Sequence, residues 1–115
     1  MKSPVETLPV LFAALADPTR LRMLGLLTSG EVCVCDLYEA LQISQPKASR
    51  HLAYLRRAGL VTTDKRGLWV YYGLAGTAET HPILTAVREA LAASKTVQRD
   101  IARLERKRCC VPATR

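Results

Sequence analysis

The sequence lacks any long hydrophobic run. No apolar stretch approaches the roughly 20 residues that a membrane-spanning helix needs, and the first residues lack the apolar core of a signal peptide. We therefore expect a cytoplasmic protein that is neither exported nor inserted into a membrane.

Acidic residues are also scarce. There are 10 Asp and Glu against 17 Lys and Arg, a formal net charge of +7. This excess favours a polyanionic partner, either nucleic acid or an anionic membrane surface. Hydrophobic residues still make up 49% of the 115 residues, which is enough for a buried core. Because the sequence has no internal repeat and no long linker, we predict a single domain over residues 1–115.

The four cysteines are not spread along the chain, as those of a small secreted protein would be. They form two close pairs, Cys33/Cys35 and Cys109/Cys110, and residues one or two apart make poor disulfides. In a reducing compartment, clustered thiols are more typical of ligands or redox groups.

Apolar residues at helical spacing predict three helices in the first third of the chain. The first lies within residues 5–15, which carry apolar side chains at helical spacing, and Pro9 is expected inside its first turn or just before it. The second begins at Asp17-Pro18, because Asp can cap a helix and Pro is tolerated at its first position, and it stops at Ser29-Gly30. The third spans about residues 35–41.

A fourth helix follows after about three residues, which is the spacing of a helix-turn-helix. Ser44 is its predicted N-cap, Pro46 is confined to its first turn and Gly59 lies just past its end. The predicted recognition helix therefore occupies about residues 44–58.

Beyond this helix the pattern changes to that of a β-hairpin. β-branched and aromatic residues at 60–63 and 68–72 flank a charged turn at 64–67, which predicts a wing over about residues 60–73. One long helix is predicted over about residues 80–108, followed by a short cysteine-containing tail. Such a helix is hard to bury in a small chain, so we expect it to pack against its copy. The predicted fold class is mainly α with a small β-hairpin (α+β), a winged helix-turn-helix that is dimeric through its terminal helices.

The polar face of the fourth helix and the tip of the hairpin carry the candidate DNA contacts. An α-helix fits the major groove, where its N-terminal part meets the bases, and a wing touches phosphate or the minor groove. His51, beside Leu52, is expected instead to be a packed histidine. The candidate DNA-binding residues are Gln45, Lys47, Ser49, Arg50, Tyr54, Arg57, Lys65 and Arg66.

Cys33 and Cys35 flank one valine at the predicted start of the third helix. In a regular helix, residues two apart point roughly 200° away from each other, whereas at an irregular helix start both thiols can face one ligand. Two thiolates would favour a soft, thiophilic ion over Mg²⁺ or Ca²⁺. The simpler alternative is a pair of small core residues.

Cys109 and Cys110 follow a basic run, which favours thiolates. The sequence leaves open whether they join Cys33 and Cys35, bind a separate ligand or are incidental thiols. Cys109 and Arg115 also have the C-x₅-R spacing of phosphate-cradling thiol enzymes, but the segment contains Pro112 and no Gly. We therefore expect no catalytic residues and no enzyme.

Two motifs together resemble the arsenic-responsive repressors of the ArsR/SmtB family. They are E-V-C-V-C-D-L at residues 31–37 and S-Q-P-K-A-S-R-H-L at residues 44–52, and the resemblance runs from about residue 9 to 75. It implies a homodimeric metalloregulatory repressor on a palindromic, double-stranded operator of arsenic resistance genes. It also implies that As(III) or Sb(III), bound by thiolates at the start of the third helix, is the inducer that releases DNA. Cys33 and Cys35 match the family's C-V-C pair, and neither an organic cofactor nor a membrane partner is expected.

The sequence departs from this family at the place of a frequent third cysteine, where it has Tyr38. The third sulfur would then come from the C-terminal pair, or its place would be taken by solvent or a small thiol. His81 alone cannot form the paired ligands that the family's zinc sensors have on the last helix. The candidate metal ligands are accordingly Cys33, Cys35, Cys109 and Cys110.

Several alternatives remain open. Within regulators of the same fold, the thiols could sense oxidants or persulfides, or four of them could bind Cd(II), Pb(II) or Zn(II). A DNA-binding protein without an inducer and, from another class, a thiol enzyme are the others.

Overall fold

The computed structural model describes residues 3–75 and 81–107, and the statements on the fold refer to these. Helices α1 (Pro4–Leu15) and α2 (Pro18–Leu26) come first, followed by β1 (Val32–Cys33), α3 (Val34–Leu41) and α4 (Gln45–Arg57). Strands β2 (Val61–Arg66) and β3 (Trp69–Leu74) form the hairpin, and α5 (His81–Ala92) and α6 (Lys95–Lys107) follow. This order confirms the predicted winged helix-turn-helix.

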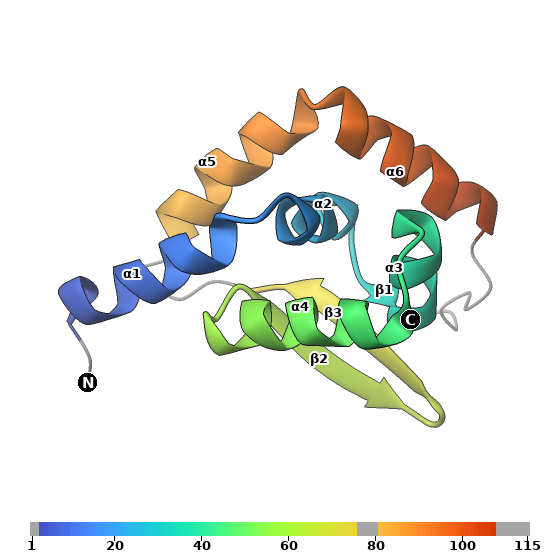
Figure 1. Cartoon of the computed structure of the whole chain (residues 1–115), viewed down its shortest axis with the longest axis horizontal. Helices are drawn as coiled ribbons and strands as arrows, with labels where there is room; N and C mark the ends of the chain where they lie inside the picture. Colours follow the sequence, from blue (N-terminus) through green and yellow to red (C-terminus); the bar gives the residue numbers. More distant parts are fainter. Residues whose placement is uncertain (1–2, 76–80, 108–115) are drawn as a thin grey trace.

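Helix α2 lies at the centre of the molecule (Figure 1). Helices α5 and α6 form an arch on one side of it, and α4 and the hairpin lie on the other. Most of the core consists of leucines from nearly every element. Within the described ranges, no helix is both long and apolar enough to cross a membrane. The largest fully buried apolar side chains are Leu11, Met23, Leu24, Leu26, Leu27, Val32, Leu37, Leu52, Leu55 and Leu60.

The predicted N-caps of α2 and α4 are confirmed. The Asp17 carboxylate accepts a hydrogen bond from the Arg20 N–H at 3.0 Å, and the Ser44 hydroxyl accepts one from the Lys47 N–H at 3.3 Å. Gln42 ends α3 in the left-handed region at φ 58°, which reverses the chain toward α4. The helix-turn-helix is therefore set by local sequence chemistry.

Helix α1 begins earlier than predicted, so Pro9 lies inside it rather than in its first turn. The reason is a better start upstream, where Pro4 occupies the first helical position. The N–H of Ser3 donates to the Glu6 carboxylate at 2.9 Å, one half of a capping box.

The sheet has three antiparallel strands in the order β1-β3-β2. The two-residue strand β1 was not predicted, and its pairing of Cys33 with Tyr71 joins the thiol pair to the wing. The predicted turn at 64–67 is also placed too early, because β2 continues to Arg66 and the turn is Gly67-Leu68. Gly67 has φ +60°, which suits the first position of a tight hairpin turn.

The prediction of one long helix over residues 80–108 is wrong within the described residues. Helix α5 ends at Ala92 and α6 begins at Lys95. At the break, the Ser94 hydroxyl accepts a hydrogen bond from the Val97 N–H at 3.3 Å and so caps α6. The bend turns α6 back onto α2 and α3, where Val97 and Leu104 become buried. Burial of these side chains outweighs the continuity of one straight helix.

Candidate DNA-binding face and thiol pair

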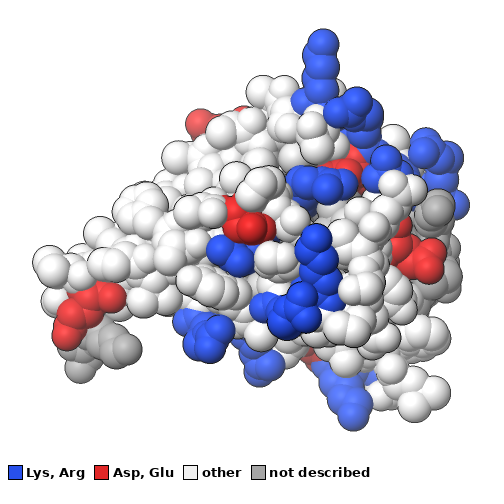
Figure 2. Space-filling view, viewed as in Figure 1, with Lys and Arg blue, Asp and Glu red and all other residues white. Residues whose placement is uncertain are grey.

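Helix α4 buries one side and exposes the side predicted to contact DNA. Ala48, Leu52 and Leu55 face the core. Lys and Arg side chains gather over the region of α4 in the space-filling view (Figure 2). Five of the predicted contact residues are exposed on this helix: Gln45, Lys47, Ser49, Arg50 and Arg57.

Tyr54, the sixth predicted contact on α4, is only partly exposed. Its ring packs against the core, and two guanidinium groups lie over it: the ring centroid is 4.1 Å from Cζ of Arg20 and 5.6 Å from Cζ of Arg57. Cation–π contacts of this kind hold a ring in place. Tyr54 therefore also anchors α4 to α2.

Arg20 is a functional candidate that the sequence reasoning missed. Its Nε donates to the carbonyl of Ala14 at 2.7 Å and its Nη2 to that of Ala13 at 3.1 Å. Its Nη1 lies 3.2 Å from Nδ1 of His51. One side chain thus ties the end of α1 to the middle of α4 and fixes the orientation of the recognition helix.

His51 is a packed histidine, as the sequence suggested. Because Arg20 has only donors, Nδ1 of His51 is the acceptor in their contact. Burial lowers the pKa of His51; Asp17 opposes this shift, and the nearby cations Arg20, Lys47 and Arg50 reinforce it. Burial alone would raise the pKa of Asp17, but its hydrogen bond from the Arg20 backbone and the neighbouring positive charges outweigh that effect and lower it.

The two predicted contacts on the wing differ from each other. Lys65 is exposed and makes no ion pair within the described residues. Arg66 instead donates to Glu31 at 2.7 Å and is paired with Asp64 at 2.8 Å, and these hydrogen bonds raise its pKa. Its charge is therefore largely offset by its own neighbours.

Arg56 is a second residue that was missed. It lines a shallow groove between α4 and the wing, together with Ser49, Ala53, Arg57 and Tyr72. The spacing of Ser49, Ala53 and Arg56 is i, i+4, i+7, so helical periodicity alone could have found it. A groove with two guanidinium groups beside a recognition helix suits a phosphate of the DNA backbone.

The thiols of Cys33 and Cys35 lie 3.3 Å apart. Cys33 precedes α3 in an extended conformation, and Cys35 lies in its first turn. This is the irregular helix start that the sequence required for both thiols to face one ligand. Cys33 is buried against Tyr71, and Cys35 is partly exposed.

The sulfur separation allows both thiols to bind one ion. An ion about 2.3 Å from each sulfur, the usual zinc–thiolate distance, would subtend an angle of about 90° at the observed separation, and a small rotation of either side chain would widen it.

Among the described residues, no third ligand is in place around this pair. Within the part of the chain that the structure describes, no group of three or more His, Cys, Asp or Glu could hold a metal ion. Cys109 and Cys110 lie outside the described residues. The described site is thus a two-thiol site that needs a third donor for a three-coordinate ion.

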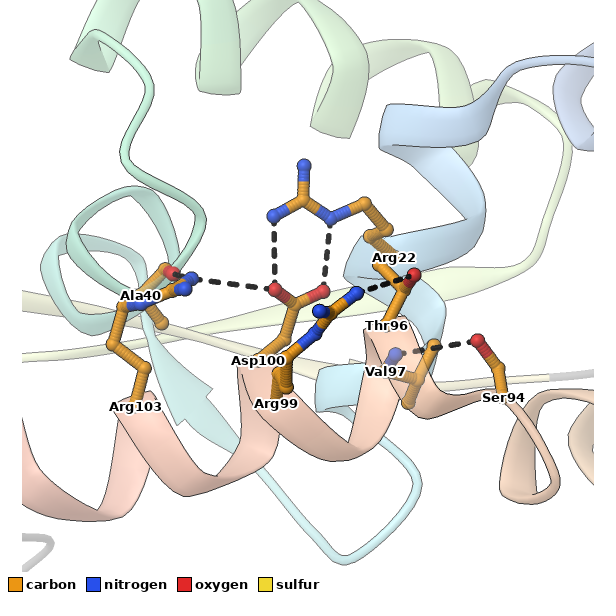
Figure 3. Close-up of polar contacts among 8 residues, drawn as sticks. All are labelled: Arg22, Ala40, Ser94, Thr96, Val97, Arg99, Asp100 and Arg103. Atoms are coloured by element: carbon orange, nitrogen blue, oxygen red, sulfur yellow. Dashed lines mark hydrogen bonds and ion pairs between the residues drawn. The ribbon is translucent and has the colours of Figure 1, made fainter.

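Helix α6 is held in place by a buried carboxylate (Figure 3). Asp100 accepts two hydrogen bonds from Arg22, at 2.9 and 2.8 Å, and Arg103 lies 3.4 Å from it. Arg103 also donates to the carbonyl of Ala40 at the end of α3 at 2.7 Å. Hydrogen bonds to Asp100 raise the pKa of Arg22. This network fixes α6 against the helix that carries the thiols.

The sequence is similar to those of known proteins. Residues 17–63 match the family described as "Bacterial regulatory protein, arsR family". An arsenic resistance transcriptional regulator of Pseudomonas putida is 55% identical over 71 residues, which are 61% of this chain and 56% of that protein. An arsenical resistance operon repressor of Escherichia coli is 57% identical over 70 residues, 59% of this chain and 60% of that protein. The match thus spans less than two thirds of the length of these relatives.

Solved structures extend the similarity over most of the chain. The crystal structure of an ArsR family transcriptional regulator superposes with a TM-score of 0.62 at 31% identity, covering 85% of this chain and 96% of that one. An exposed basic recognition helix beside a wing defines the class of winged helix-turn-helix regulatory proteins. Within that class, the chain belongs to the ArsR family. The relatives are regulators and repressors by name, which agrees with the prediction that the chain is not an enzyme.

Proposed function

We propose that this protein is a homodimeric transcriptional repressor that binds a palindromic operator of arsenic resistance genes and releases it when As(III) or Sb(III) binds its thiols. The observation that carries the proposal is the pair of sulfurs 3.3 Å apart at the start of the helix-turn-helix. The names of the Pseudomonas and Escherichia relatives support the same inducer.

DNA binding rests on the exposed side of α4. Gln45, Lys47, Ser49 and Arg50 lie toward its N-terminal half and would meet base edges, while Arg57 and Lys65 would meet phosphates. Tyr54 and Arg66 are held by neighbouring residues and would contact DNA only at the edge of the protein–DNA interface. The excess of basic charge would supply the salt-dependent part of the affinity.

A homodimer would present two such helices to the two half-sites of a palindrome. Helix α1 exposes Val5, Val10 and Phe12 by 82%, 45% and 54% of their surfaces. Val5 and Phe12, seven residues apart, share one face of α1, and an exposed apolar face of this kind favours an interaction surface. We propose that α1, together with α5 of the predicted C-terminal dimerisation segment, forms the dimer interface, and that α6, which packs on α2 and α3, does not.

Release requires that the inducer bind the DNA-free conformation more tightly, by about 1.4 kcal/mol for each tenfold loss of operator affinity. Cys33 and Cys35 would supply two sulfurs of a pyramidal As(III) site. The third would come from Cys109 or Cys110, or from a small thiol in solution.

The test is operator binding by fluorescence anisotropy, with fragments from upstream of the gene, reduced protein and an arsenite titration. We expect release at micromolar arsenite in the wild type and none in Cys33→Ser. The Cys109→Ser/Cys110→Ser variant would need more arsenite if the C-terminal pair supplies the third sulfur, and the same amount if a small thiol does. Tight binding that ignores arsenite would contradict the proposal, and release by peroxide or polysulfide alone would point to a redox sensor.

A further inference from the structure

One face of the sheet carries the buried thiol, an aromatic ring and a guanidinium group side by side. Cys33 of β1 pairs with Tyr71 of β3, and Tyr71 pairs with Asp64 of β2. Directly paired residues lie on the same face, and so do residues two apart along one strand. Arg66 therefore shares this face with Cys33 and Tyr71.

Arg66 holds the Tyr71 ring in place. Its guanidinium carbon lies 4.6 Å from the ring centroid. The same group is hydrogen-bonded to Glu31 at 2.7 Å and to Asp64 at 2.8 Å. Glu31 lies two residues before Cys33 in the same extended segment. The Cys33 thiol, the Tyr71 ring, the Arg66 guanidinium and the Glu31 carboxylate thus form a continuous set of contacts. These contacts connect the segment around β1 to the wing.

A ligand cannot reach both sulfurs without disturbing these contacts. Cys33 is 1% exposed and Tyr71 is 4% exposed, and the two pack against each other. An ion bonded to the Cys33 sulfur must therefore displace what covers it. Because packed interiors do not deform continuously, either the Cys33 side chain or the ring must move, and the ring cannot move without Arg66.

We propose that Tyr71 and Arg66 are positioning residues that couple the thiol pair to the wing. A thiophilic ion at Cys33 and Cys35 displaces the Tyr71 ring and thereby loosens Arg66 from Glu31. The β2–β3 hairpin then moves relative to α4, so that the two can no longer contact DNA together. The inference rests on the proposed function and specifies its regulation. This path through the sheet would act in addition to any distortion of α3.

The chain contains its own reporter of this motion. Trp69 is the only tryptophan; it pairs with Arg66 across the hairpin and is 48% exposed. We expect arsenite to change the emission of Trp69 and its quenching by iodide in DNA-free wild-type protein, with the same midpoint as arsenite binding. Cys33→Ser should abolish the change.

Two substitutions test the path itself. Glu31→Gln removes the charge that ties Arg66 to β1, and Glu39→Gln, an exposed residue of α3, is its matched control. Tyr71→Leu removes the ring, and Tyr71→Phe keeps it. We expect Glu31→Gln and Tyr71→Leu to bind arsenite with the wild-type stoichiometry, measured by equilibrium dialysis. Their loss of operator affinity on binding should be at least about fivefold smaller than that of the wild type. Glu39→Gln should behave as the wild type, and Tyr71→Phe, which keeps the ring, should stay closer to the wild type than Tyr71→Leu does.

The outcomes separate this inference from the proposed function. Absence of arsenite binding to the wild type would overturn both. Arsenite binding and operator release with unchanged Trp69 emission, or with Glu31→Gln and Tyr71→Leu releasing DNA as the wild type does, would overturn the coupling alone. The emission test uses unaltered protein, so it decides the matter even if a variant fails to fold.

Discussion

Helices α4 and α6 have the same length, 13 residues, and both are basic, yet they use their charge differently. On α4, the cations Lys47, Arg50, Arg56 and Arg57 are exposed and make no ion pair among the described residues. On α6, Arg103 is paired with a buried carboxylate and bonded to α3. Part of the basic charge of α6 is therefore neutralised by pairing, whereas that of α4 is not.

The difference comes from the acidic partners of the two helices. Asp100 is 1% exposed and pairs with Arg22 of α2 and with Arg103 of α6 itself, whereas α4 has no acidic residue of its own. A buried charge is tolerated only when it is paired and hydrogen-bonded. Asp100 therefore commits α6 to packing, and the absence of an acid on α4 leaves its arginines to an external anion.

The largest effect is expected from Asp100→Asn, which breaks the pairing on α6. Removing one partner of a buried ion pair typically costs about 3–5 kcal/mol. Arg22 and Arg103 are partly exposed, so they can regain water, and we expect the lower end of this range. Urea unfolding would measure it, with exposed Glu105→Gln on the same helix as the control. Equal stability of the two variants would show that Asp100 does not hold α6.

The second prediction compares one exposed arginine on each helix. Arg50→Ala should weaken operator binding by about 1–3 kcal/mol without a change in unfolding free energy. Arg99→Ala on α6 should leave operator affinity almost unchanged. Anisotropy at two salt concentrations would measure both. Equal losses for the two variants would mean that general charge, rather than the face of α4, governs binding.

The third prediction concerns the packing of α6 against α2. A Cβ atom at Gly25 would lie 2.6 Å and 2.9 Å from the two methyl carbons of Val97. Gly25→Ala should therefore destabilise the fold by about 1–2 kcal/mol, since overpacking exceeds the gain of about 1 kcal/mol from a better helix former. Gly25→Ala combined with Val97→Ala should recover most of this loss in thermal unfolding. A stabilised single variant would show that Val97 can move aside without cost.

Local chemistry made much of the fold predictable. Asp17, Ser44 and Gly67 each act within a few residues of their place in the chain, so the caps and the hairpin could be read from the sequence. The break between α5 and α6 could not, because apolar residues continue across it and the partner of Asp100 is 78 residues away. Sequence patterns do not show such distant pairings.

The candidate site likewise has a part that the sequence could predict and a part that it could not. The exposed side of α4 follows from helical periodicity, and five of its six predicted contacts are exposed. The pairing of Arg66 with Glu31 spans 35 residues, and β1 is too short to show an alternating pattern. For that reason the connection between the thiols and the wing emerged only from the structure.

The smallest effect is expected from His51, which lies beneath the exposed face of α4. Since burial lowers its pKa below the usual value of about 6.5, the unfolded chain takes up the proton first as the pH falls. Stability is therefore highest above pH 6.5 and declines as the pH falls from there through the lowered pKa of the folded state. The proton would also remove the acceptor that Nδ1 offers to Arg20 at 3.2 Å.

His51→Asn should reduce the difference in melting temperature between pH 7.5 and pH 5.5, because the amide cannot take up that proton. His81→Asn, at an exposed position on α5, is the matched control and should keep the wild-type difference. If the two variants lose stability equally at the lower pH, then carboxylates rather than His51 set the acid limit of the fold. A smaller difference in melting temperature in His51→Asn alone would mean that the packed His51 side chain causes part of the pH dependence of the fold. The charged side of α4 would stay available to DNA.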